Sequence, residues 1–267
     1  MTARAQHSGP ARGNDAPPAE VIWHEVECGR YRADLPLWRE LADAAAPRSG
    51  RARVLDVGSG IGRVALDLAA AGHQVTALDI SAALLAELAR RAGGLPVRTT
   101  VGDAREIALE ERDFDLCVVP MQTLQLLRDA GERRALFAGA AAHLRAGGLL
   151  ACAIVTAVDE FDSLAGGLGP SPDRLAVGER TYFSRPLRVG IADGKITIER
   201  ERVVLPADRA GQERWRDTGE LNIVELACVT EEELWREAAG AGLHAEPTLV
   251  IGETEEHAAS EVVVLRA

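Results

Sequence analysis

The stretch Val54-Leu55-Asp56-Val57-Gly58-Ser59-Gly60-Ile61-Gly62-Arg63-Val64-Ala65-Leu66-Asp67-Leu68-Ala69 combines three local signals. It opens as a short apolar run, which is typical of a buried parallel strand. Its second half has apolar residues at helical spacing. Three glycines lie at the join, where glycine takes a positive φ without strain and lets a ligand approach the backbone. The stretch predicts a strand, a tight turn and a helix whose bare N–H groups offer a site for the polar part of a nucleotide-like ligand.

A carboxylate at the end of the next predicted strand supports nucleoside binding. Residues 74–80 read as the next strand, and Asp79 lies at its C-terminal tip. A carboxylate about 20 residues after the glycine turn can accept hydrogen bonds from both hydroxyls of a ribose, as in dinucleotide-binding enzymes. Asp79 therefore favours a nucleoside without choosing the cofactor, and a turn aspartate would give the same pattern.

The spacing of the glycines separates two families. A dinucleotide fingerprint reads G-x-G-x-x-G, whereas this chain has G-x-G-x-G, with Arg63 where the third dinucleotide glycine would stand. With Asp56 in front, the pattern D-x-G-x-G-x-G resembles motif I of the class I methyltransferases that use S-adenosylmethionine. The turn Gly102-Asp103-Ala104, after a predicted strand over 96–101, is similar to the adenine-binding motif of that family.

The resemblance covers roughly residues 50–155 and the closing strands, and it implies a role for each motif. The N–H groups of the glycine turn would face the methionine end of the cofactor, and Asp56 would orient its ammonium. Asp79 would hold the ribose, and Asp103 with Ala104 the adenine. The residues expected to bind S-adenosylmethionine are Tyr31, Asp56, Gly58, Ser59, Gly60, Gly62, Asp79, Ile80, Asp103, Ala104, Pro120, Met121 and Gln125.

Strand and helix patterns alternate five times between residues 50 and 156, which predicts a doubly wound parallel sheet with right-handed crossovers. Two further strand patterns, over 244–251 and 260–266, match the antiparallel hairpin with which the methyltransferase fold ends. We therefore expect an α/β protein with a mostly parallel, seven-stranded Rossmann-like sheet, built from residues 50–156 and 230–267. Residues 1–19 read as a disordered tail, and residues 20–46 as an N-terminal helical lid.

The pattern changes after Val155. Residues 157 to about 180 read as loop, Asp193-Gly194 predicts a hairpin turn, and another strand is expected around 221–229. We interpret residues 157–229 as an antiparallel insertion that covers the substrate, although a structural or dimerising platform would show the same pattern. The candidate acceptor contacts are Trp23, Gln122, Tyr182, Arg185 and Trp215.

Composition narrows the class of substrate. A net charge of −11 argues against nucleic acid, whose phosphates call for a basic surface. At the end of the strand over 114–120 the chain reads Val-Pro-Met-Gln. Many methyltransferases that act on nucleic-acid bases or glutamine amides have (Asn/Asp)-Pro-Pro-(Tyr/Phe) here. This difference favours a small-molecule substrate. The four cysteines are far apart and predict reduced thiols without a metal site. No signal peptide or long apolar segment is present, so we expect a cytoplasmic monomer or homodimer.

The sequence thus predicts transfer of a methyl group from S-adenosylmethionine to a small-molecule acceptor by in-line displacement. No catalytic residue is assigned, because His73 and His143 belong to the predicted scaffold and no motif supports His24 or Glu220 as a base. Two alternatives stay open. One is an NAD(P)-dependent oxidoreductase, which shares the ribose-binding acid, and the other is a non-catalytic protein that binds S-adenosylmethionine.

Overall fold

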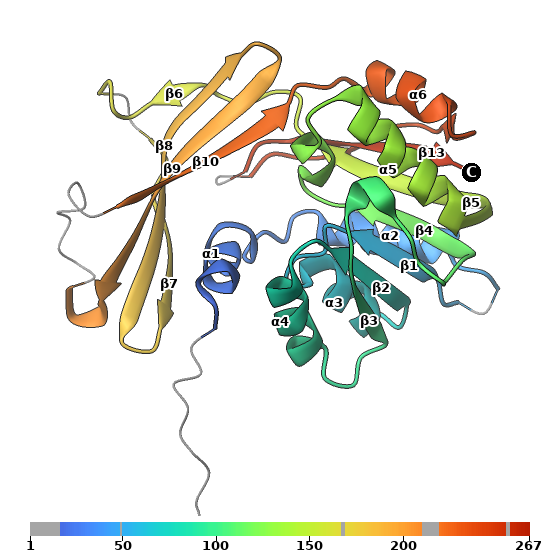
Figure 1. Ribbon diagram of the computed structural model, residues 1–267, viewed down its shortest axis with the longest axis horizontal. Coiled ribbons are helices and arrows are strands. Elements are labelled where there is room, and N and C mark those ends of the chain that lie inside the picture. The colour runs from blue at the N-terminus through green and yellow to red at the C-terminus, as the bar shows by residue number, and fades with distance from the viewer. Residues whose placement is uncertain (1–16, 49, 167–168, 210–218, 255–256) are drawn as a thin grey trace, which may run out of the picture.

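The protein is described here by a computed structural model, which covers residues 17–48, 50–166, 169–209, 219–254 and 257–267. Figure 1 shows two β-sheets, the larger of which carries helices on both faces. Five strands of the larger sheet are parallel, and the closing strand β13 (Ser260–Arg266) runs antiparallel to β5. The parallel strands are β1 (Arg53–Val57), β2 (Gln74–Asp79), β3 (Val97–Val101), β4 (Phe114–Val119) and β5 (Leu144–Ile154).

The strand order is β11-β13-β5-β4-β1-β2-β3, which confirms the predicted doubly wound, Rossmann-like sheet. The first of the two expected closing strands is split into β11 (His244–Ala245) and β12 (Leu249–Ile251), and both pieces pair with β13. β5 begins at Leu144, five residues before the expected Leu149, because α5 ends at His143 and the chain pairs with β4 at once.

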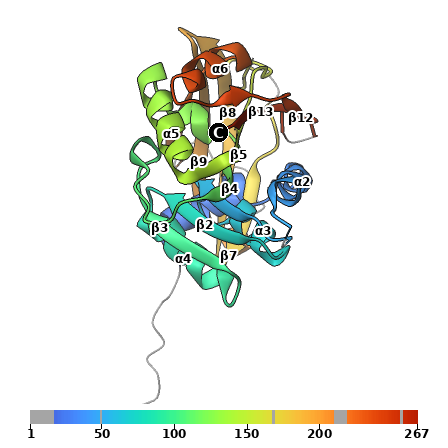
Figure 2. The same cartoon turned by 90° about the vertical axis from the view of Figure 1, so that its right-hand side faces the viewer.

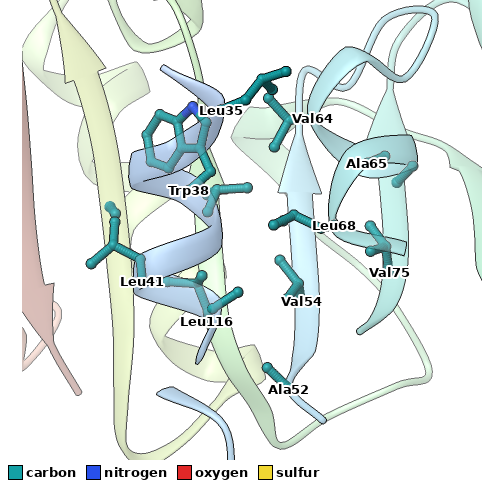
Figure 3. Packing of buried hydrophobic residues seen from close by; sticks show 14 of the residues in the cluster. Leu35, Trp38, Leu41, Ala52, Val54, Val64, Ala65, Leu68, Val75 and Leu116 are labelled. Carbon is teal, nitrogen blue, oxygen red and sulfur yellow. The ribbon is translucent and has the colours of Figure 1, made fainter. Parts of the chain in front are cut away.

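Two hydrophobic cores lie on opposite faces of the larger sheet. Helices α2 (Leu35–Ala45), α3 (Arg63–Ala70) and α4 (Ala82–Ala92) cover one face, and α5 (Ala130–His143) and α6 (Glu231–Ala239) cover the other. Along β1, Val54 belongs to the first core and Leu55 to the second. Figure 2 shows α2 and α5 on opposite sides of the sheet, and Figure 3 shows Trp38 of α2 in the same buried cluster as Val54 of β1 and Leu68 of α3. A strand buried on both faces explains the unbroken apolar runs in the sequence.

The second sheet has the order β10-β9-β8-β6, with β7 paired to β8. Its strands are β6 (Phe161–Asp162), β7 (Asp173–Val177), β8 (Arg180–Ala192), β9 (Lys195–Pro206) and β10 (Glu220–Ala227). Asp193 and Gly194 both have positive φ in the turn between β8 and β9, as the hairpin prediction required. The expectation of a loop over 157–180 was wrong at β6 and β7. Strand β7 is short and half exposed, and it is stabilised by its pairing with β8 and by its contacts with α1; local sequence carries no sign of either.

Helix α1 (Ala19–Cys28) lies between the two sheets and contacts α4, β7 and β8 (Figure 1). On one side, Glu27 accepts hydrogen bonds from Arg202 of β9 at 2.6 and 2.8 Å and from Ser184 of β8 at 2.6 Å. On the other side, Glu25 accepts a hydrogen bond from Arg91 of α4 at 2.6 Å. Charged groups therefore join α1 both to the second sheet and to α4, which packs on the larger sheet.

The segment between α1 and α2 is tied to the glycine turn by Asp34. Its side chain caps no helix N–H, although its position before α2 favours an N-cap. Instead Asp34 accepts hydrogen bonds from Trp38 Nε1 at 2.8 Å and from Arg63, the first residue of α3, at 2.7 Å. The pair is buried, with side-chain exposures of 6% for Arg63 and 1% for Asp34. Asp34 has helical φ and ψ, and the buried ion pair takes its carboxylate away from the helix end.

Replacing Arg63 with methionine is expected to lower the free energy of unfolding by about 3–5 kcal/mol, because Asp34 is left as an uncompensated buried charge. Urea unfolding of the purified variants measures this. The double variant Asp34→Asn/Arg63→Met should recover part of the loss, since it removes both charges.

The matched control is Arg39→Met. Arg39 of α2 pairs with Asp67 of α3, so this pair joins the same two helices, but the Arg39 side chain is 46% exposed. Its loss should cost much less than the loss of Arg63, because an exposed ion pair contributes little to stability. An Arg63→Met variant no less stable than Arg39→Met would contradict the role given to the buried pair.

Candidate functional site

The glycine turn lies at the carboxyl end of β1, beside the carboxyl ends of β2 and β4, where ligands of open α/β sheets bind. Gly58, Gly60 and Gly62 have φ of +73°, +54° and +88°, values that side chains rarely adopt. The N–H groups of Gly58 and Ser59 both donate to Leu78 O of β2, at 2.8 and 3.1 Å. The backbone of the turn is therefore fixed against β2.

Two side chains crowd the glycines. A Cβ on Gly58 would lie 2.4 Å from Thr123 Cγ2, and a Cβ on Gly60 would lie 2.3 Å from His24 Nε2. Thr123 begins η2 (Thr123–Leu126), the 3-10 helix after β4, and His24 belongs to α1. Conformation and space thus both require glycine at these two positions. The positions of Thr123 and His24 at the turn could not be predicted from the sequence, because no local pattern brings either residue there.

Buried polar atoms without a hydrogen-bond partner gather at this turn. Among the described residues they include both carboxylate oxygens of Asp56, Ser59 Oγ and His24 Nδ1. A buried polar group without a partner is costly, so such groups call for an explanation, and a ligand is one. Asp56 is fully buried, and burial raises the pKa of its carboxyl to about 7, although the charge of Arg63 acts in the opposite direction.

Asp79, the last residue of β2, holds the glycine turn through a hydrogen bond. Its Oδ2 accepts a hydrogen bond from Gly60 N at 2.8 Å, and its Oδ1 accepts one from Ser81 N at 2.9 Å. These backbone donors orient the carboxylate, and each oxygen keeps a lone pair for a further donor. The neighbouring Ile80 is 70% exposed, so a large apolar side chain borders Asp79 at the edge of the sheet.

Asp103 and Ala104 follow β3, on the same edge. Ala104 begins η1 (Ala104–Glu106) and Asp103 is its N-cap residue. Arg105 donates to the Asp103 carboxylate through Nε at 2.9 Å, and its backbone N–H does so at the same distance. These bonds lower the pKa of Asp103 to about 2, so the group is ionised at neutral pH.

The segment after β4 has mixed roles. Pro120 is buried, Gln122 is half-buried, and Met121 has a φ of +54°, a strained value for a residue with a Cβ. Gln125 is buried, and its amide is fully engaged. Nε2 donates to Val155 O and Ala227 O at 2.9 and 3.0 Å, and Oε1 accepts from Val155 N at 2.8 Å. Gln125 therefore joins the ends of β5 and β10, and its role as a cofactor contact stays a prediction.

Tyr31 is buried between two other elements. The Arg63 guanidinium lies 5.2 Å from its ring centroid, and the His257 ring packs against it at 4.5 Å. Burial raises the pKa of its hydroxyl above the usual value. The structure thus brings Tyr31 to the charged pair beside the glycine turn.

The expected acceptor contacts divide between the two faces of the second sheet. Trp23 of α1 packs edge-to-face on Tyr182 of β8, with ring centroids 5.3 Å apart. Tyr182 shares its face with Ser184 and Arg202, which contact α1, whereas Arg185 pairs with Glu201 on the opposite face. Trp215 lies outside the described residues.

The described ranges contain no group of three or more His, Cys, Asp or Glu side chains that could hold a metal ion. They also contain no helix that is both long and apolar enough to cross a membrane.

Comparison with known proteins gives a domain match for part of the chain and a shared fold. Residues 54–148 match the model of a methyltransferase domain. Over 167 residues the chain is 30% identical to cypemycin N-terminal methyltransferase from a Streptomyces species, an alignment that covers 62% of this chain and 59% of that protein. The chain thus spans less than two thirds of the length of this curated relative.

Solved structures share the whole architecture. S-adenosylmethionine-bound CalS10, an amino pentose methyltransferase from Micromonospora echinaspora, superimposes with a TM-score of 0.66 at 24% identity, over 92% of this chain and 96% of that one. The sugar N-methyltransferase KedS8 from a Streptoalloteichus species gives 0.66 at 19% identity, over 98% and 99%. Residues 54–148 of this chain thus match a methyltransferase domain, and the chain shares its fold with solved methyltransferases.

Proposed function

We propose that this protein transfers a methyl group from S-adenosylmethionine to an amine of a small-molecule acceptor. The observation that carries the proposal is the cluster of unpaired buried polar atoms on Asp56 and Ser59, beside two crowded glycines and the oriented carboxylate of Asp79. A rigid, polar, partly unsatisfied turn fits a ligand that has an ammonium and a ribose.

Each end of the cofactor has a fitting group on this edge. When bound, S-adenosylmethionine supplies a methyl group activated by its sulfonium. Asp56 would face the ammonium, the lone pairs of Asp79 would accept the ribose hydroxyls, and Asp103 would accept from the adenine amino group. The exposed Ile80 side chain offers an apolar surface for the adenine ring.

The names of the relatives support an amine acceptor. One is named an N-terminal methyltransferase, one an amino pentose methyltransferase and one a sugar N-methyltransferase. A neutral amine is itself a nucleophile, so this reaction needs positioning more than a strong base. That agrees with a site in which no base is assigned. The net charge of −11 argues against nucleic acid as the acceptor.

The second sheet lies opposite the carboxyl ends of β1, β2 and β3, which would bind the cofactor and are called the cofactor edge below. It forms one wall of the proposed acceptor site. Asn222 pairs with Arg200 and Val224 with Ile198, and all four side chains share the face that α1 contacts. They are half-buried, whereas Leu221 and Ile223 on the other face are more than half exposed. We propose that this inner face contacts the acceptor. Gln125 would keep the wall at a constant distance from the cofactor edge, because it bonds to both sheets.

The cofactor assignment predicts that Asp79→Ala weakens binding of S-adenosylhomocysteine by at least about tenfold, because charge-assisted hydrogen bonds to the ribose are lost. Isothermal titration calorimetry of the parent and the variant measures this, with NAD and NADP titrated separately. Circular dichroism checks that the variant is folded, since Asp79 also accepts from Gly60 N. Equal affinity of the variant would overturn the ribose assignment. Binding of a nicotinamide cofactor alone would favour an oxidoreductase.

The Asp56 assignment predicts a pH dependence. Its pKa of about 7 means that below pH 7 the carboxyl must release a proton before it can pair with an ammonium. Affinity for S-adenosylhomocysteine should therefore rise about tenfold from pH 6 to pH 8 and level off above. In Asp56→Asn this part of the pH dependence should disappear. A slope unchanged in the variant would show that another group titrates.

The raised pKa of Asp56 also predicts how the free energy of unfolding of the protein without ligand changes with pH. Between about pH 4 and pH 7 the folded state binds the Asp56 proton more tightly than the unfolded state does, because burial raises the folded pKa. The Asp56 contribution to the free energy of unfolding should thus decrease as pH rises through this window. Comparing urea unfolding of the parent and Asp56→Asn isolates that contribution.

The acceptor wall predicts a difference between two neighbouring residues. Val224→Phe adds bulk to the inner face and should raise the KM for the acceptor at least about tenfold without changing affinity for S-adenosylhomocysteine. The matched control is Ile223→Phe, which introduces the same aromatic side chain at the adjacent, 53% exposed position on the opposite face. Steady-state kinetics with an amine acceptor found by screening gives both values. Equal effects of the two variants would place the acceptor elsewhere.

A further inference from the structure

His24 occupies a position that neither its sequence context nor the methyltransferase motifs assign. Its ring lies directly over Gly60, with Nε2 and Cε1 at 2.3 and 2.6 Å from the point where a Cβ would stand. Gly60 also donates its N–H to Asp79 Oδ2. The imidazole and the proposed ribose carboxylate therefore both border the same glycine.

The backbone that carries His24 is held on both sides. Glu25 pairs with Arg91 of α4, and Glu27 pairs with Arg202 of β9. On the flank towards the glycine turn, Val21 packs with Ile61 and Leu84. The contacts come from both sheet systems, so α1 is fixed over the turn and the imidazole is preorganised there.

The imidazole is neutral and incompletely bonded. Burial lowers the pKa of His24, more than the carboxylates of Asp79, Glu25 and Glu27 raise it, while the charge of Arg63 also lowers it. A neutral imidazole carries one N–H donor and one acceptor nitrogen. Nδ1 is buried and has no hydrogen-bond partner. A group without a partner in this position suits a ligand more than a purely structural role.

The hydrogen bonds that a bound ribose would need indicate a role for His24. Asp79, as a carboxylate, only accepts hydrogen bonds, so it takes the hydrogens of the ribose hydroxyls and leaves their oxygen lone pairs without a donor. The nearby neutral imidazole has such a donor. We propose that His24 is a cofactor-binding residue whose ring N–H donates to a ribose hydroxyl oxygen, opposite Asp79. This inference rests on the proposed function.

The test is equilibrium binding of S-adenosylhomocysteine and of its 2′-deoxy and 3′-deoxy analogues to the full chain. His24→Phe keeps a planar ring and removes the nitrogen atoms. It should weaken binding of S-adenosylhomocysteine about 3- to 10-fold, as expected for one hydrogen bond. For the analogue that lacks the contacted hydroxyl, parent and variant should bind equally well.

Two further variants separate this role from packing. His24→Asn retains a donor and should recover part of the affinity if Phe disturbs the fold. Arg188→Gln breaks an ion pair with Glu199 on the face of the second sheet that lies away from α1, so it should leave the affinity unchanged.

The outcomes are distinct. Equal losses for all three ligands in His24→Phe would show that His24 only packs against Gly60, and no loss would remove it from the site; either result overturns the inference. If the parent chain itself does not bind S-adenosylhomocysteine, the proposed function fails first.

Discussion

The buried ion pair between Asp34 and Arg63 is the constraint on which the site depends. Arg63 is the first residue of α3, directly after the glycine turn, and Asp34 is the last residue before α2. Their pairing fixes the chain that leads from α1 to the turn that would bind the cofactor. The same guanidinium lies over Tyr31 and acts on the pKa of Asp56. One cation thus links the fold of the N-terminal segment to the electrostatics of the site.

The glycine turn shows how packing and function share the same atoms. Thr123 of η2 packs against Gly58, and His24 of α1 packs against Gly60. A side chain at either glycine would therefore displace a neighbour. The polar atoms left unpaired beside them raise the energy of the unliganded protein. A ligand that satisfies those atoms would gain from a turn whose shape is already set, since little ordering cost remains at binding.

The second sheet is attached at two points rather than through a broad core. Gln125 bonds to the ends of β5 and β10, and Glu27 of α1 bonds to β8 and β9. A small apolar cluster around Val155, Ile196 and Leu226 lies near the first point. The inner face between these attachments stays half-buried. Such an arrangement gives the second sheet a defined position relative to the larger one, and the inner face that we propose contacts the acceptor lies between the two attachments.

The sequence by itself determined the Rossmann-like sheet, the glycine turn, the tip position of Asp79 and the hairpin at Asp193-Gly194, because each depends on local periodicity or on the special φ of glycine. Tertiary structure decided the rest. Strand β7 depends on its pairing with β8 and on its contacts with α1, and the Asp34 side chain pairs with Arg63 instead of capping α2. His24 reaches Gly60 only because α1 folds back over the turn. These contacts join residues far apart in the chain, and no local pattern encodes them.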